Sequence, residues 1–285
     1  MKSIAVVIPW FGKLPPTYTM WRTSVLYNRT IDFYLYTDVE CASEGNLRVV
    51  HTTFEKFKGM LQRQFDFTIA CARPYKLCDY KPVYGMVLHK LLAQYDFWGY
   101  CDMDMVFGDI RSFLTDAVLS QNERIFYDGH LSLFKNDERM NSLYMLEGEW
   151  PEYNYEEAFT TDDACYFDEY RGMELKCIRA SVRCYSDGTM RCNFDPKLPK
   201  YYKGGKQVIA HWKQGRLYTV SQDGETREMV YVHIAKRSFV NQIGPEAEDF
   251  VVLPGLICEA DGMRFNKYYQ MGGVNYTNIN GWLSA

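Results

Sequence analysis

The chain has 285 residues, of which 47% are hydrophobic and 24% are charged, a balance typical of a protein that buries a core. Its formal net charge of −4 gives no general attraction to nucleic acid, so an anionic ligand would need a local site. Aromatic residues make up 16% of the chain, including 23 Tyr and 17 Phe. This excess suits either a sugar-facing surface or an aromatic core.

The first third of the chain alternates strand and helix signals. An apolar run at residues 4–9 predicts a buried strand and is too short for the core of a signal peptide. Further strands are expected at Ile31–Thr37 and residues 47–52, and helices at residues 19–28 and 54–71. Strands separated by helices indicate parallel βαβ units, in which ligands bind at the carboxyl ends of the strands.

A helix is expected to begin at residue 79. Pro82 is tolerated in the first turn of a helix. Val83, Val87 and Leu91 recur at intervals of four, so they share one helix face that can pack on a core.

The next segment joins an apolar strand to two acidic residues. Residues 95–100 predict a buried strand, which leads directly to Asp102 and Asp104. In an extended chain, carboxylates two residues apart point to the same side, where their repulsion is costly unless a positive group lies between them. The pair therefore indicates a site rather than a structural feature.

The later part of the chain is more mixed. We expect a strand at Leu131–Lys135, a short helix at residues 136–146, mostly short strands at 177–232, a strand at 229–234 and an apolar run at 251–257. Because the sequence contains no internal repeat or long linker, it favours a single compact domain with elaborations.

Paired aspartates at a strand end are typical of a divalent cation site. A hard cation prefers carboxylate oxygens, and when it also carries phosphates it takes only one or two of them from the protein. Mn²⁺ or Mg²⁺ held by Asp102 and Asp104 would neutralise the charge that develops on a departing diphosphate. Two aspartates at this spacing also occur by chance in solvated turns, and the preceding apolar strand is what favours the site.

Several stretches resemble a bacterial family of glycosyltransferase-like proteins associated with surface or capsular polysaccharide synthesis. The most specific is CDMDMVFGDI at residues 101–110. The resemblance implies the GT-A type of nucleotide-diphospho-sugar transferase fold, an α/β fold whose mixed, mainly parallel central sheet is flanked by helices. The stretches that carry it are residues 8–15, 76–85, 95–110, 129–136 and 233–237.

The same resemblance implies a domain organisation. A catalytic domain would span residues 1–240, with a nucleotide-binding half at 1–110 and an acceptor half at 111–240. Residues 241–285 would form a C-terminal extension, and beyond residue 250 nothing resembles the family.

For the nucleoside, the resemblance points to the ends of the first two strands. Pro9, Trp10 and Phe11 would lie on one side of the base and ribose, and Thr37 and Asp38 on the other. An aromatic ring can stack on a base, and an aspartate can accept hydrogen bonds from its polar edge. Core packing is the alternative role for Trp10 and Phe11.

Lys81 resembles the basic residue that meets the nucleotide sugar in related transferases. Its alternative role is an ion pair with Asp79 or with a neighbouring carboxylate. The position, just before the expected acidic site, suits either role.

The resemblance also implies a third metal ligand late in the chain. His233 fits this place because it ends an apolar strand, and Lys236 and Arg237 follow it as candidates to bind the diphosphate. A lone histidine on a strand is often only packed or hydrogen-bonded. His211 is the competing candidate for the ligand.

Transfer to an acceptor hydroxyl with inversion needs a carboxylate base. Asp168 and Glu169 are the first candidates because they follow the apolar pair Tyr166-Phe167, and partial desolvation would raise a carboxyl pKa toward a useful range. An acidic run of this kind is equally consistent with a solvated face.

Together these features predict a metal-dependent hexosyltransferase that uses Mn²⁺ or Mg²⁺. It would move a sugar from a nucleoside diphosphate donor to a polysaccharide or lipid-linked glycan acceptor. A UDP-sugar is the favoured donor. One alternative is a carbohydrate-binding GT-A-like protein without transfer activity. Another is a sugar nucleotidyltransferase, which the lack of a Gly-rich basic loop after the first strand disfavours. No nucleic acid partner is expected.

The nine cysteines include no CxxC pair, and their odd number argues for reduced thiols in a cytoplasmic protein. No stretch reaches the ~20 apolar residues that cross a bilayer. Because lipid-linked acceptors lie at the inner membrane face, weak peripheral association there is a further expectation.

Overall fold

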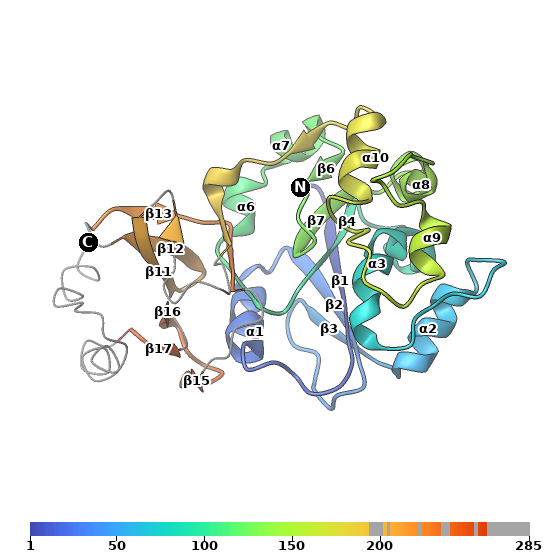
Figure 1. The fold of residues 1–285 in the computed structure, drawn as a ribbon. Coiled ribbons are helices and arrows are strands. Elements are labelled where there is room, and N and C mark those ends of the chain that lie inside the picture. The colour runs from blue at the N-terminus through green and yellow to red at the C-terminus, as the bar shows by residue number, and fades with distance from the viewer. Residues whose placement is uncertain (194–201, 204–205, 222–223, 235–239, 254–255, 261–285) are drawn as a thin grey trace. The chain divides into compact units, whose positions relative to one another are not determined.

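The computed structural model describes residues 1–193, 202–203, 206–221, 224–234, 240–253 and 256–260. It confirms the α/β class, with mixed sheets and flanking helices in two compact units (Figure 1). Both units draw on chain from either side of residue 110, where the sequence analysis placed a boundary between two halves. Unit 1 is Met1–Leu14, Arg29–Asp102 and Leu114–Ser186, and unit 2 is Pro15–Asn28, Met103–Phe113 and Asp187–Ala285.

The sheet of unit 1 is mixed and mainly parallel. Its strand order is β3-β2-β1-β4-β7-β6-β8. The pairs β1–β2, β2–β3, β1–β4 and β6–β8 are parallel, and β7 runs antiparallel to both of its neighbours. The strands are β1 (Ile4–Trp10), β2 (Ile31–Thr37), β3 (Leu47–His51), β4 (Phe97–Cys101), β6 (Arg124–Ile125), β7 (Leu131–Lys135) and β8 (Cys184–Tyr185).

The helices of unit 1 pack on the sheet through a large aromatic core. Figure 1 shows α2, α3, α8 and α9 grouped beside the sheet. Trp98 and Tyr100 of β4 and Tyr80 and Tyr84 of the helices are fully buried in this core. The helical elements are α2 (Phe54–Gln62), η1 (Pro74–Lys76), α3 (Leu77–Tyr80), η2 (Lys81–Val83), α4 (Tyr84–Val87), α5 (His89–Leu92), α7 (Asp116–Gln121), α8 (Glu138–Ser142), η3 (Leu143–Met145), α9 (Tyr155–Phe159) and α10 (Met173–Arg179).

Helix α2 is shorter than predicted, because it ends at Gln62 rather than near residue 71. The Gln62 side chain takes over the hydrogen bonding of the following loop. Its Nε2 donates to the Phe67 carbonyl at 2.7 Å, and its Oε1 accepts from the Ile69 amide at 3.0 Å. The apolar residues of that loop pack as a turn rather than as further helix.

The single helix expected from residue 79 is divided into short pieces. Pro82 has no N–H and cannot donate the hydrogen bond that would continue the helix, and the chain forms the 3₁₀ turn η2 there. A second break follows at Leu88, whose backbone leaves the helical region between α4 and α5. Cys177, expected at the start of a run of strands, lies in α10.

The described residues of unit 2 form helices and two sheets. Among its described residues, one sheet has the order β13-β12-β11-β16-β17-β15, with β10 beside β11, and the other has the order β5-β14-β9. The elements are α1 (Tyr18–Tyr27), β5 (Met105–Phe107), α6 (Ile110–Phe113), η4 (Gly188–Met190), β9 (Arg191–Asn193), β10 (Tyr202–Lys203), β11 (Lys206–Lys213), β12 (Arg216–Ser221), β13 (Thr226–Glu228), β14 (Tyr231–His233), β15 (Val240–Asn241), β16 (Asp249–Leu253) and β17 (Leu256–Glu259).

Trp212 is the centre of packing in unit 2. It stacks on Phe250, its Nε1 donates to the Phe107 carbonyl at 2.9 Å, and Tyr27 of α1 meets it edge-on. The apolar run expected at 251–257 forms two antiparallel strands, β16 and β17, instead of one. Within the described part of the chain, none of the helices has the length and apolar character needed to span a membrane.

Candidate functional site

The carboxyl ends of the parallel strands in unit 1 lie along one edge of the sheet. Trp10 at the end of β1 is paired in register with Thr37 at the end of β2. On the other side of β1, Val7 is paired with Tyr100 of β4, so β4 also ends at this edge. In open α/β sheets, this edge is where ligands bind.

The residues predicted to meet a nucleoside lie at this edge, but several already have structural partners. Asp38 accepts a hydrogen bond from the Gly12 amide at 2.8 Å, and buried Thr37 accepts one from Val39 at 3.1 Å. Half-buried Trp10 donates through Nε1 to the Lys13 carbonyl at 3.1 Å.

Phe11 lies in the aromatic core of unit 1. Its ring centroid is 5.7 Å from that of Phe54 and 5.9 Å from that of Phe57. Pro9, two residues earlier, is half-buried. Phe11 therefore packs in the core, which was the alternative role considered for it.

Asp102 begins where β4 ends. Its amide donates to the His130 carbonyl at 3.0 Å and extends the β4–β7 ladder by one residue. The chain then leaves the extended conformation at Met103 and Asp104. The prediction that both aspartates lie in an extended segment is thus wrong, because the chain bends between them. Asp102 is the last residue of its segment in unit 1, and Asp104 lies near the start of a segment of unit 2.

Lys81 supplies a positive charge to one member of the acidic pair, Asp102. Its Nζ lies 2.8 Å from Oδ1 of Asp102 and 3.3 Å from Oδ2 of Asp168, and it donates to the Gly129 carbonyl at 2.7 Å. Burial disfavours the ammonium form, but the two carboxylates outweigh it and raise the pKa of Lys81 well above its usual value. Lys81 is therefore charged and pairs with Asp102 and Asp168.

Asp168 is a buried carboxyl group with a strongly raised pKa. It is only 4% exposed, and burial raises its pKa to about 7, although Lys81 acts in the opposite direction. The negative charges of Glu169 and Asp102 raise the pKa further. A carboxyl with a near-neutral pKa is suited to exchange protons at physiological pH.

Glu169 lies beside Asp168 and is half-buried. Its Oε1 accepts a hydrogen bond from the Gly129 amide at 3.1 Å. A Cβ atom on Gly129 would lie 2.5 Å from Oε1 of Glu169 and 2.6 Å from Oδ2 of Asp168. A glycine at position 129 is therefore what lets both carboxylates come close to the backbone at this residue.

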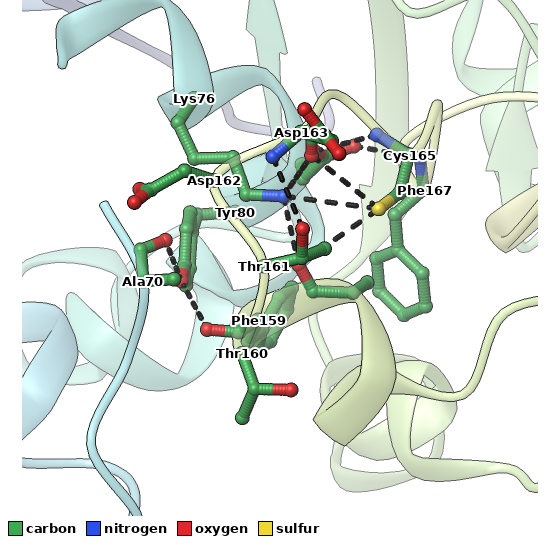
Figure 2. Close-up of polar contacts among 12 residues, drawn as sticks. Ala70, Lys76, Tyr80, Phe159, Thr160, Thr161, Asp162, Asp163, Cys165 and Phe167 are labelled. Atoms are coloured by element: carbon green, nitrogen blue, oxygen red, sulfur yellow. Dashed lines mark hydrogen bonds and ion pairs between the residues drawn. The ribbon is translucent and has the colours of Figure 1, made fainter. Parts of the chain in front are cut away.

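A buried ion pair that sequence reasoning did not identify holds the loop carrying these acids (Figure 2). Nζ of Lys76 lies 2.8 Å from Oδ2 of Asp79 and also donates to the carbonyls of Ala158 and Asp163. Asp79 therefore pairs with Lys76 and not with Lys81. The i,i+3 spacing of Lys76 and Asp79 was the available signal, but only the tertiary structure buries it.

The described part of unit 2 brings together two of the predicted metal ligands, Asp104 and His233. Oδ1 of Asp104 lies 3.3 Å from Nε2 of His233, and the Asp104 carbonyl accepts from the Ile234 amide at 2.9 Å. The β9–β14 register places Asn193 beside His233, and its Oδ1 lies 3.0 Å from the imidazole Nδ1. Asn193 was not predicted, because the pairing of β9 with β14 is invisible in the sequence.

Three candidate residues remain: His211, which the structure describes, and Lys236 and Arg237, which it does not. Nε2 of His211, the competing histidine, lies 2.7 Å from Oδ1 of Asp249 on the neighbouring strand β16. That contact gives His211 a structural partner. Lys236 and Arg237, predicted to bind the diphosphate, lie outside the described residues.

The comparisons with known proteins give a family without a function. No curated protein matches the sequence. Residues 6–261, which cover most of the chain, match the model of a family of unknown function, DUF6625. The chain therefore belongs to the DUF6625 family.

Proposed function

We propose that this chain is a metal-dependent glycosyltransferase of the GT-A type, which moves a sugar from a nucleoside diphosphate to a glycan acceptor. The observation that supports it best is the pairing of Asp104 with His233, whose Nδ1 faces the amide oxygen of Asn193. An acidic residue and an oriented imidazole together are typical of metal ligands rather than of a solvated turn.

The donor set fits a divalent cation. When Nδ1 of His233 carries the proton and donates to Asn193, the Nε2 lone pair faces a carboxylate oxygen of Asp104. Two acceptors that face each other are repulsive unless a proton or a cation lies between them. Asn193 would then orient the imidazole in the way that hydrogen-bonded partners orient metal-binding histidines.

Asp102 is the proposed third ligand. It precedes Asp104 by two residues, so chain connectivity alone keeps their Cα atoms within about 7.6 Å. Lys81 takes up Oδ1 of Asp102, and no described residue donates to Oδ2, which leaves that oxygen for a ligand. Bound Mn²⁺ or Mg²⁺ would neutralise the charge of the departing diphosphate.

Lys81 has a positioning role in this proposal. It orients Asp102 through the 2.8 Å contact with Oδ1, and it lies 3.3 Å from Asp168. The Lys81 ammonium bridges the two carboxyl groups and fixes their positions, while burial and the charges of Glu169 and Asp102 keep the pKa of Asp168 at about 7 despite the ammonium. A direct contact of Lys81 with the nucleotide sugar remains part of the proposal and would require one of these partners to be released.

Asp168 and Glu169 are the proposed proton acceptors for the acceptor hydroxyl. Glu169 is the more exposed of the two and can meet a bound hydroxyl. Asp168 has a pKa of about 7, so its ionisation would set the pH dependence of transfer. Trp10, Thr37 and Asp38 would flank the nucleoside at the carboxyl ends of β1 and β2.

The test is a hydrolysis screen of UDP- and GDP-sugars, with and without Mn²⁺. It is run on the parent protein, on Asp104→Ala and on His211→Gln, a control histidine outside the proposed ligands. We expect release of the nucleotide in the presence of Mn²⁺, loss of this activity in Asp104→Ala, and activity within twofold of the parent in His211→Gln. Turnover that survives both metal removal and Asp104→Ala would disprove the assignment.

A further inference from the structure

Tyr166 has a backbone conformation that bulky residues rarely adopt. Its φ is 55°, in the left-handed region, where a side chain with Cβ crowds its own backbone. Such outliers persist only where surrounding contacts hold them, and they cluster at functional sites.

The buried ion pair of unit 1 is what holds Tyr166 in this conformation. Asp79 accepts a hydrogen bond from the Cys165 amide through Oδ2 and from the Phe167 amide through Oδ1, each at 2.9 Å. These two amides flank Tyr166, and Lys76 neutralises the carboxylate that binds them. Figure 2 shows Lys76 in contact with Asp163 and Cys165 of the same loop.

As a consequence, some side chains of this loop are buried in the protein while their neighbours in the sequence are exposed to solvent. Phe167 and Asp168 are buried, whereas Tyr166 is 45% exposed and Tyr170 is 53% exposed. The two tyrosine rings pack against each other, with centroids 5.4 Å apart and planes inclined by 30°, and each ring keeps an exposed part. No described residue forms a hydrogen bond with either tyrosine hydroxyl, so both hydroxyls can bind a ligand.

We propose that the rings of Tyr166 and Tyr170 form a platform that binds a neutral pyranose ring of a glycan. The axial C–H groups of a pyranose pack on an aromatic face, and the phenol groups can exchange hydrogen bonds with sugar hydroxyls. The chain between the two tyrosines carries Asp168 and Glu169. Identifying this glycan as the acceptor rests on the proposed function, whereas its binding does not.

The charge around the platform selects the class of sugar. Besides the half-buried Glu169, the same stretch carries exposed Asp162 and Asp163. Uronic acids and other anionic sugars would be repelled by these carboxylates, while neutral hexoses and N-acetylhexosamines would not. A neutral oligosaccharide is therefore the occupant to which the surface is complementary.

The test measures glycan binding without nucleotide or metal. Saturation-transfer NMR is recorded with maltohexaose, cellohexaose and chitohexaose on the full chain and on Tyr170→Ala, Tyr170→Phe and Tyr75→Ala. Tyr75 is an equally exposed tyrosine on another segment. We expect at least one hexasaccharide to bind. Tyr170→Ala should weaken that binding at least fivefold, Tyr170→Phe should weaken it less because the ring is kept and only the hydroxyl is lost, and Tyr75→Ala should stay within twofold of the parent.

Binding of none of the three glycans, or binding that Tyr170→Ala leaves unchanged, would overturn the proposal. A melting temperature for each variant confirms that the loss is not one of folding. Glycan binding without Mn²⁺-dependent donor hydrolysis would leave the platform standing and refute the proposed function. Donor hydrolysis without glycan binding would do the reverse.

Discussion

Nζ of Lys76 lies 2.8 Å from Oδ2 of Asp79, and neither side chain is more than 1% exposed. Each residue neutralises the other, and Asp79 also binds the two amides that flank Tyr166. A buried pair of this kind adds little net stability compared with a hydrophobic pair, but removing one partner leaves an uncompensated charge in the core.

We therefore expect Lys76→Met to lower the free energy of unfolding by about 3–5 kcal/mol, measured by urea denaturation. Lys90→Met, at an exposed lysine, is the control and should change it by no more than about 0.5 kcal/mol. Lys76→Met/Asp79→Leu should cost less than the sum of the single changes, because it leaves no unpaired charge. Strict additivity of the two would contradict a coupled pair.

The raised pKa of Asp168 makes stability depend on pH. Below about pH 4 the group is protonated in both states, and above about pH 7 it is ionised in both, because its pKa rises from 3.8 to about 7 on folding. Between these values the folded state holds a proton that the unfolded state has lost, so its contribution to stability falls as pH rises, by up to about 1.4 kcal/mol per pH unit. Asp168→Asn should remove this slope.

The measurement is urea denaturation of the parent and of Asp168→Asn from pH 4 to pH 8. The difference in unfolding free energy between the two proteins should change in favour of Asp168→Asn as pH rises to 7 and then level off. A difference that stays flat over this range would show that Asp168 is ionised throughout.

Gly129→Ala should push the carboxyl groups of Asp168 and Glu169, the two candidate bases, away from residue 129. The new Cβ would come within 2.5 Å of Glu169 and 2.6 Å of Asp168, so one carboxylate must move. A displacement of about 1 Å can reduce a reaction rate about 100-fold, and we expect a loss of this size in sugar transfer with Mn²⁺ binding unchanged. Gly188→Ala, whose Cβ meets nothing within 4 Å, is the matched control and should keep full activity.

Asn193→Ala should weaken metal binding without removing a ligand. Nδ1 of His233 would lose the amide oxygen that lies 3.0 Å away, and loss of such an orienting partner typically lowers metal affinity about 10-fold to 100-fold. Mn²⁺ titration followed by electron paramagnetic resonance measures this change. An affinity equal to that of the parent would mean that His233 is not oriented by Asn193 or is not a ligand.

Tyr166→Gly tests the effect of the backbone conformation on stability and the effect of the ring on glycan binding in one variant. Glycine adopts the left-handed conformation of residue 166 without the clash that a side chain makes, and the strain relieved is of order 1–3 kcal/mol. We expect the melting temperature to stay the same or rise, while hexasaccharide binding is lost. A large drop in melting temperature would show that the Tyr166 ring is needed for folding.

The local elements were largely predictable because hydrophobic periodicity is written in neighbouring residues. The first strands and their parallel order followed from apolar runs separated by helical segments. Errors arose where a single side chain outweighed the pattern. Gln62 ended α2 by taking over backbone hydrogen bonds, and Pro82 broke the following helix into short turns.

The sequence by itself determined the α/β class and drew attention to Asp102, Asp104, His233 and Asp168. Only the tertiary structure decided which partner each one meets: Lys81 reaches Asp102 and Asp168, and Asn193 faces His233. The physical reason is that strand and helix signals depend on residues a few positions apart. Burial, pKa and hydrogen bonding depend instead on segments brought together from distant parts of the chain, as Asp79 and the Tyr166 loop are.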